Sequence, residues 1–396
     1  MSAFPEATDQ GWRRRLRSRV LRWYDNNGRK LPWRESADPY RIWVSEIMLQ
    51  QTTVAAVIPY FDRFTEQFPD VQSLAAAEQE QVLKLWEGLG YYSRARNLHK
   101  AANVIVDELD GQFPQAKDEL QKLPGIGPYT AGAISSFAFN LPAGILEANT
   151  LRLYSRLIEL DIDPRSTQGQ KTLWNFADWV VAQKRAGDFN QAVMDIGSQV
   201  CRPADPACPT CPLMPSCKGY EAGKQTTIPM EKKKPEITDV VEVSVAIRKD
   251  NRFLLRQRNE NERWAGLWDF ARFEISESDG KRIKMPAKKT RTRKKVLPGQ
   301  KKLFTPEAIR RELKLPPKIA TELEDQTGLV ANSYNPVVEI KHAVTRYRIR
   351  LKCMVCDDTT GRIKQGSGYQ WCSARQLEEL PLSTTGRQFA EMLLNG

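Results

Sequence analysis

The chain has 396 residues, of which 41% are hydrophobic, so it is long enough for two ordinary domains and is not intrinsically disordered. It has no apolar run of membrane-spanning length, and the residues before position 11 lack the apolar core of a signal peptide, so we expect a cytoplasmic protein. The net charge is +12, but eleven Lys and Arg and no acid lie in 281–302, so this charge says little about the folded parts.

Residues 11–222 have the pattern of helices. Apolar residues recur at three- and four-residue spacings, and glycine and proline separate the helical stretches at 88–90 and 124–128. The following residues, 223–238, are polar and charged and contain two prolines, which is typical of a linker. We therefore predict a helical domain over residues 1–222.

One acid lies inside an apolar helical stretch. Glu46 has Trp43, Ile47 and Met48 as near neighbours in the sequence. A lone glutamate on a helix is ordinarily solvated, but burial among such side chains raises its pKa and lets it hold a proton near neutral pH. Glu46 is therefore a candidate general acid.

Residues 123–132 connect two helical stretches through a tight turn that contains Gly125 and Gly127. Glycines there allow the backbone amides of the turn and of the next helix to point outward together, which favours binding of a DNA phosphate without reading base sequence. An ordinary helix–helix turn is the alternative interpretation of these residues.

A second candidate acid, Glu147, stands two residues before Asn149. Breaking an N-glycosidic bond builds positive charge on the sugar, and a carboxylate below the ring stabilises that charge or attacks it. The pair of Glu46 and Glu147 therefore suits the hydrolysis of such a bond.

Four of the seven cysteines lie close together with the spacing C-x6-C-x2-C-x5-C: Cys201, Cys208, Cys211 and Cys217. Without a secretion signal, such clustering favours a metal site over disulfides. The single short C-x2-C unit with longer arms on both sides favours one 4Fe–4S cluster, with zinc as the alternative. We predict that the cluster lies in a loop at 201–217.

Residues 239–396 have an α+β pattern. Strand-like alternation occurs at 241–245 and 337–355, and 387–394 has a helical pattern. A basic, proline-containing insertion at about 279–302 is expected to be disordered. Two further cysteines, at 353 and 356, face opposite sides of a predicted strand, so no metal site is expected there.

In combination, these motifs resemble the MutY-type adenine DNA glycosylases over nearly the whole chain. The strings that carry the resemblance lie at 31–34, 45–52, 88–100, 123–132 and 189–197. The resemblance implies several domains: an all-α helix-hairpin-helix glycosylase domain with an iron–sulfur cluster loop, followed by an α+β Nudix-like domain.

The resemblance also implies how the catalytic residues act. Glu46 protonates adenine at N7, and Tyr129 and Asn149 lie around the sugar and the second acid. Relatives that also cut the DNA strand carry a lysine where this chain has Tyr129, so base removal without strand scission is expected. The family normally has aspartate in place of Glu147, and this longer side chain requires a shift of backbone or substrate.

Further residues match positions that contact the DNA bases. The adenine pocket is expected to be lined by four side chains: Trp33, Arg34, Leu49 and Gln191. Gln51 and Tyr91 match residues that are wedged into the duplex beside 8-oxoguanine, which offsets part of the cost of extruding adenine.

The C-terminal domain resembles the Nudix-like domain by which the family inspects 8-oxoguanine. The family's Phe-Ser-His loop corresponds here to 344–346, where Thr345 keeps the hydroxyl but the aromatic ring and the imidazole are absent. An incomplete Nudix box at 321–329 predicts recognition without hydrolase activity.

We therefore predict a monomeric, monofunctional enzyme of base-excision repair. It flips adenine out of adenine:8-oxoguanine or adenine:guanine mispairs in double-stranded DNA and hydrolyses the N-glycosidic bond. Two alternatives stay open: a related glycosylase with another target base, and a mismatch-binding protein that has lost catalysis.

Overall fold

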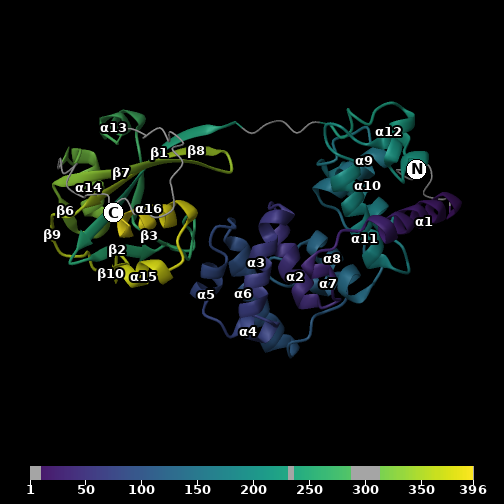
Figure 1. Ribbon diagram of the computed structural model, residues 1–396, viewed down its shortest axis with the longest axis horizontal. Coiled ribbons are helices and arrows are strands. Elements are labelled where there is room, and N and C mark those ends of the chain that lie inside the picture. Colours follow the sequence, from purple (N-terminus) through teal and green to yellow (C-terminus); the bar gives the residue numbers. More distant parts are fainter. Residues whose placement is uncertain (1–9, 231–235, 287–312, 396) are drawn as a thin grey trace, which may run out of the picture. The chain divides into compact units, whose positions relative to one another are not determined.

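The computed structural model describes residues 10–230, 236–286 and 313–395 (Figure 1). It divides into two compact units, and the segment 78–93 belongs to the second of them. Unit 1 contains residues 1–77 and 94–233, and unit 2 contains residues 78–93 and 234–396. The chain passes from unit 1 to unit 2 inside the polar stretch that the sequence predicts as a linker.

The described residues of unit 1 form helices and the loops between them, without strands. Its α-helices are α1 (Gln10–Asn27), α2 (Pro39–Leu49), α3 (Val54–Gln67), α4 (Val71–Ala75), α6 (Ser93–Leu109), α7 (Lys117–Leu120), α8 (Pro128–Phe139), α9 (Ala148–Leu157), α10 (Thr167–Val180), α11 (Ala186–Asp195) and α12 (Lys218–Glu221). Short helical turns are η1 (Pro32–Arg34), the π-helical η2 (Ile196–Val200), η3 (Cys208–Thr210) and η4 (Met214–Ser216). No helix among the described residues has both the length and the apolar composition needed to cross a bilayer.

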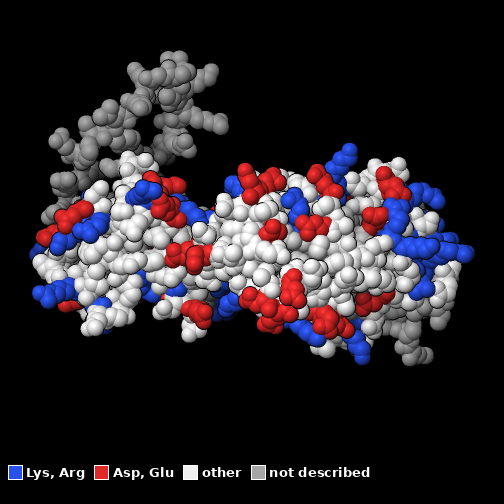
Figure 2. Space-filling view, turned by 90° about the horizontal axis from the view of Figure 1, so that it is seen from below, with Lys and Arg blue, Asp and Glu red and all other residues white. Residues whose placement is uncertain are grey.

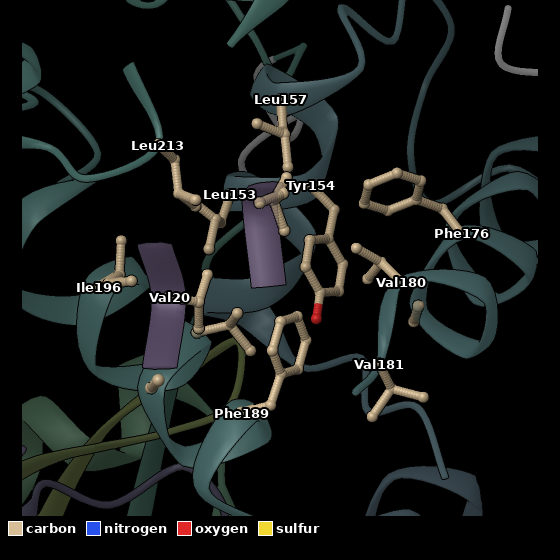
Figure 3. Close-up of a cluster of buried hydrophobic side chains, with 14 of the residues drawn as sticks. Val20, Leu153, Tyr154, Leu157, Phe176, Val180, Val181, Phe189, Ile196 and Leu213 are labelled. Atoms are coloured by element: carbon tan, nitrogen blue, oxygen red, sulfur yellow. The ribbon is translucent and has the colours of Figure 1, made fainter. Parts of the chain in front are cut away.

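A core of apolar side chains joins α1, α9, α10 and α11 of unit 1 (Figure 3). The rings of Tyr154 and Phe176 meet edge to face, with their centroids 5.3 Å apart. Leu213, from the loop that carries the clustered cysteines, is buried in the same core. The loop is therefore held to the helices by apolar packing as well as by polar contacts.

Unit 2 is built on a mixed sheet that has eight strands within its described residues, with the path β10-β2-β1-β8-β7-β5 and with β3 and β4 paired to β2 and β1. The strands are β1 (Thr238–Lys249), β2 (Arg252–Gln257), β3 (Trp268–Asp269), β4 (Ala271–Ile275), β5 (Leu313–Lys314), β7 (Ser333–Val344), β8 (Tyr347–Cys356) and β10 (Tyr369–Ser373), while β6 (Leu329–Ala331) and β9 (Thr359–Gly361) form a separate pair. The helices are α5 (Gln79–Leu85), α13 (Glu277–Arg282), α14 (Pro317–Thr327), α15 (Ala374–Glu379) and α16 (Thr384–Leu394). The β1–β8 pair is parallel, and the other pairs are antiparallel.

The two faces of this sheet bury separate cores because successive side chains of a strand point to opposite sides. Alternate residues of β1, from Val241 to Ile247, pack in one core with α14, and the other core contains α16. Cys353 and Cys356 of β8 lie in different cores, as expected for residues three apart in a strand. The sheet is therefore covered by helices on both faces.

Charged side chains of both signs are interspersed over the face that Figure 2 shows. Lys and Arg gather at the right-hand end of that view, the end at which α1 lies in Figure 1, and α1 carries six arginines. The predicted basic insertion overlaps the end of α13, and its residues from 287 onward lie outside the described part of the chain.

Candidate active site

A cavity of about 750 Å³ in unit 1 is lined by both candidate acids. Eleven residues predicted from the sequence line it: Trp33, Arg34, Glu46, Leu49, Gln51, Gly125, Gly127, Tyr129, Glu147, Asn149 and Gln191. They come from η1, from α2 and the residues just after it, from the turn before α8 and the first turn of α8, from the start of α9, and from α11. Five separate segments of the chain thus contribute to one cavity, which is large enough for a purine nucleoside.

Glu46 is the most deeply buried acid of the cavity, with 3% of its surface exposed. The Tyr129 hydroxyl donates a hydrogen bond of 2.6 Å to Glu46 Oε2. Burial raises the pKa of Glu46 to about 7, although the Tyr129 hydrogen bond and the charge of Arg34 lower it, and nearby Glu147 raises it further. A carboxyl with this pKa can donate a proton at neutral pH and take one back.

Glu147 is the N-cap of α9. Its Oε2 accepts hydrogen bonds from the backbone N–H of Asn149 at 2.8 Å and from the Asn149 Nδ2 at 3.1 Å, and its Oε1 accepts from the Thr150 N–H at 2.9 Å. Burial raises the pKa of Glu147, and these hydrogen bonds oppose the rise. The Glu147 carboxylate thus caps α9 and also lines the cavity.

Asp195, whose side chain is fully buried, holds two arginines at the cavity wall. It accepts from Arg34 Nη1 at 2.8 Å and from Arg29 Nε at 2.6 Å. Burial alone would raise the pKa of Asp195, but the hydrogen bonds and charges of Arg34 and Arg29 outweigh burial and keep the pKa below its usual value. Asp195 could not be predicted as a site residue, because an acid in an apolar run does not reveal which distant cations it contacts.

Tyr24 is another cavity-wall partner with no signal in the sequence. Its hydroxyl donates to Oε1 of Gln191, and the guanidinium of Arg34 lies 6.0 Å from the centre of its ring. Tyr24 therefore fixes the Gln191 amide while packing against the cation beside it.

The two glycines of the predicted hairpin are required at their positions for different structural reasons. Gly125 has φ +77°, and a Cβ there would lie 2.6 Å from the Cβ of Asn97. Gly127 is the N-cap of α8 and faces open space, so a ligand can approach the first amides of that helix.

The residue after α2 is held by a buried arginine of α6. Arg94 Nη1 donates to the carbonyls of Ile47, Met48 and Gln50 at 2.6–2.9 Å, which covers the C-terminal end of α2. Gln51 follows with φ +56° and is exposed at the edge of the cavity.

Two predicted site residues lie in unit 2 and do not line the cavity. Tyr91 has φ +49° and 46% of its surface exposed. Thr345 occupies the turn between β7 and β8 with φ +52°, and its hydroxyl donates to the Val344 carbonyl at 2.7 Å.

Two arginines of α9 bind the loop that contains the cysteines. Arg156, 2% exposed, donates to the carbonyls of Arg202, Pro203 and Ile228 at 2.7–2.8 Å, and its Nη1 lies 3.3 Å from Cys201 Sγ. Arg152 donates to the Cys201 carbonyl at 2.8 Å and to Asn149 Oδ1 at 3.0 Å. The same helix therefore supports both the cysteine loop and the residues beside the second acid.

The four clustered cysteines are free thiols that line one small cavity together with Leu153, Leu157 and Leu213. Burial raises the pKa of Cys211 to about 12 and that of Cys217 to about 11, so these thiols stay protonated unless a bound cation offsets the cost of charging them. No group of three or more Cys, His, Asp or Glu in the described part of the chain is arranged to hold a single metal ion. Four thiols that line one apolar cavity are soft donors of the kind that an iron–sulfur cluster takes as ligands.

Two family models match the chain. Residues 44–178 match the HhH-GPD superfamily of base excision DNA repair proteins, and residues 243–392 match the NUDIX domain. The first match contains both acids of the cavity and the glycine hairpin, and the second contains the mixed sheet.

Similar proteins extend these matches. The chain is 44% identical to a mouse adenine DNA glycosylase over 233 residues, which cover 57% of this chain and 45% of that protein. It is 39% identical to an adenine DNA glycosylase of Buchnera aphidicola subsp. Schizaphis graminum over 256 residues, which cover 64% of this chain and 74% of that protein. A solved structure of a thermostable thymine-DNA glycosylase matches with a TM-score of 0.50 at 28% identity, covering 54% of this chain and 99% of that one.

Proposed function

Because the chain belongs to the adenine DNA glycosylase family, we propose that it removes mispaired adenine from duplex DNA by hydrolysing the N-glycosidic bond. The observation that carries this proposal is the cavity shared by Glu46 and Glu147, in which the pKa of Glu46 is raised to about 7. An acid near its pKa beside a second carboxylate provides the two groups that cleavage of a glycosidic bond needs.

The proposed reaction has two steps. Protonated Glu46 donates its proton to N7 of the flipped adenine, the bond between N9 and C1′ breaks, and neutral adenine leaves. Glu147 stabilises the positive charge that develops on the sugar. Water then adds to C1′ and returns a proton to Glu46, which leaves an abasic site and regenerates the acid.

Base removal is proposed to occur without strand scission. The described residues that line the cavity include Tyr129 but no lysine, and strand scission through a Schiff base requires an amine that can attack C1′. The arginines of the wall are held in ion pairs with Asp195 and do not substitute for such an amine.

Recognition is proposed to divide between the two units. Trp33, Arg34, Leu49 and Gln191 enclose adenine in the cavity. Gln51 and Tyr91 insert into the duplex, and Thr345 contacts 8-oxoguanine or guanine opposite the adenine. Extrusion of a base costs on the order of a few kcal/mol, and inserted side chains offset part of this cost.

DNA phosphate is proposed to bind at the turn before α8. Gly127 leaves open space in front of the first amides of a helix, and such amides bind a phosphate through their N–H groups and through the helix dipole.

One 4Fe–4S cluster is proposed to be held by Cys201, Cys208, Cys211 and Cys217. When bound, it supplies a cross-link between the ends of the loop, and we assign it no step in the reaction. The residues of α9 orient this loop through the Arg156 hydrogen bonds to its carbonyls.

The test is single-turnover base release with enzyme in excess over a duplex that contains one adenine opposite 8-oxoguanine, guanine or thymine. We expect adenine release opposite the first two bases, strand breaks only after alkali, and no covalent complex on addition of borohydride. The Glu46→Gln variant should bind the same duplex without releasing base.

Three results would contradict the proposal in different ways. No base release at stoichiometric enzyme would end it. Tight binding of the mispair by the unsubstituted protein without an abasic product would indicate a mismatch-binding protein. Release of another base would indicate a related glycosylase.

A further inference from the structure

A segment from the middle of the helical half of the sequence is bound to the sheet unit. Residues 78–93 contain α5 and the turn that follows it, and they belong to unit 2. Tyr91, proposed above to insert beside the base opposite adenine, lies in this segment.

The first set of contacts holds the start of α5. Glu80 Oε1 accepts from Trp268 Nε1 at 2.7 Å and from Gln257 Nε2 at 3.1 Å. Trp268 and Gln257 pair with each other in the register of β2 and β3, so α5 is bound to a paired region of the sheet.

The second set of contacts lies at the end of α5 and is ionic. Arg387 of α16 binds Glu87 with two parallel hydrogen bonds, Nε to Oε1 at 2.6 Å and Nη2 to Oε2 at 3.1 Å. The two side chains are only 18% and 12% exposed, so water screens this pair weakly. The same guanidinium donates to the carbonyls of Leu377 and Leu380 at 2.7 and 2.6 Å, which fixes its position.

The turn after Glu87 has little freedom of its own. Gly88, Gly90 and Tyr91 have φ angles of +96°, +75° and +49°. Trp86 Nε1 donates to the Gly90 carbonyl at 3.1 Å, and the Tyr92 hydroxyl, which accepts from Gly88 N–H, donates to the Leu382 carbonyl at 3.4 Å. A tyrosine with positive φ persists only where its surroundings impose that conformation.

We propose that the Glu87–Arg387 pair positions the turn 88–92, so that the Nudix-like unit itself holds Tyr91 in the conformation that inserts into the duplex. Arg387 and Glu87 are therefore positioning residues that act through Tyr91. The inference rests on the proposed function, because it takes from there the role of Tyr91. Tyr91, the inserted side chain, then belongs to the same unit that inspects the opposing base.

The test uses the whole chain, and three substitutions are common to both readouts or serve as their control. Glu87→Gln removes the charge of the pair and leaves the contacts of Arg387 to the two carbonyls intact, and Arg387→Met removes the guanidinium. Arg375→Met is the matched control, because Arg375 is 87% exposed and pairs with Glu379 within its own helix, α15, which belongs to the same unit.

The first readout is hydrogen–deuterium exchange of the free protein over residues 86–93. We expect both Glu87→Gln and Arg387→Met to accelerate exchange about tenfold, which corresponds to the loss of one charge-assisted hydrogen bond. The Arg375→Met control should exchange like the unsubstituted protein. Unchanged exchange in Glu87→Gln would overturn the proposal, whatever the protein does to DNA.

The second readout is the emission of 2-aminopurine placed next to 8-oxoguanine in a duplex, measured with the Glu46→Gln background so that no base is released. Binding should raise the emission as stacking is broken, Tyr91→Ala should abolish the rise, and Glu87→Gln should reduce it while the Arg375→Met control retains it. A full rise in Glu87→Gln, or in Tyr91→Ala, would contradict the inference. If the unsubstituted enzyme releases no adenine while these emission changes occur, the proposed function fails and the positioning role stands.

Discussion

Replacing Tyr129 by phenylalanine tests the protonation state on which the proposed chemistry depends. Glu46 must carry a proton to donate it, and its pKa is about 7, so the rate of base release should fall as pH rises through about 7. Tyr129 donates to Glu46 Oε2 at 2.6 Å, which favours the ionised carboxylate and lowers its pKa. Removing the hydroxyl therefore raises the pKa of Glu46 and moves the fall in rate to higher pH.

The size of the shift follows from the hydrogen bond. A hydrogen bond to a charged group contributes about 1.5–3 kcal/mol, and about 1.4 kcal/mol corresponds to one pH unit, so the midpoint should rise by about one to two pH units. Consider a pH about one unit above the midpoint of the unsubstituted enzyme. There, the fraction of the low-pH rate that remains should be about five to ten times larger in the variant than in the unsubstituted enzyme.

The assay is single-turnover release of adenine opposite 8-oxoguanine across the pH range in which the duplex is stable. Tyr40→Phe is the control, because Tyr40 is a buried tyrosine of α2 whose hydroxyl donates to the Phe68 carbonyl at 2.7 Å and not to an acid. A midpoint in Tyr129→Phe that is unchanged, or lower, would refute the reasoning.

Three further predictions follow from the same contacts. Glu147→Gln keeps one acceptor oxygen for the cap of α9 but removes the other and the charge that faces the sugar, so base release should fall by about a hundred- to a thousandfold, while unfolding should lose only the contribution of about one capping hydrogen bond; Glu147→Asp should retain turnover. Asp195→Asn leaves two arginines without their carboxylate in a buried site, so the free energy of unfolding, measured in urea, should drop by about 3 kcal/mol. This value is at the low end for broken buried pairs because Arg29 is partly exposed. A drop as small as that for an exposed ion pair would contradict the prediction. Arg156→Met removes the donor to three carbonyls around the cysteine loop, so iron and acid-labile sulfide per chain should fall below those of the unsubstituted protein; full occupancy in a folded variant would show that the loop does not depend on this arginine.

Several site residues were predictable because their local sequence fixes their place. Gly125 and Gly127 mark the turn before α8, and Tyr129 follows two residues later on the first turn of the helix, so its place near the helix start follows from the turn. Glu147 and Asn149 likewise lie at the start of α9, where a capping side chain has a local function.

Other features had no local signal. Tyr24 meets Gln191, and Arg34 meets Asp195, across more than 160 residues of sequence. Residues 78–87 have an ordinary helical pattern that ends at the glycines of 88–90, and nothing in that pattern indicates that Glu87 pairs with Arg387, 300 residues further along. Long-range partners of this kind depend on the packing of whole units, which periodicity does not encode.

Residues close along the chain were enough to predict the two kinds of unit, the positions of the turns, the cysteine cluster and the two candidate acids. The burial of Glu46 beside Tyr129, which goes with a pKa of about 7, comes from the fold, since that value depends on which groups surround the carboxyl. The fold also places Tyr91 in the sheet unit, where Glu87 pairs with Arg387 of α16, a contact that residues near Glu87 in the sequence do not indicate. The sequence near a residue thus indicates which chemical group is present, whereas the burial of that group and the partners of its charge are set by the fold.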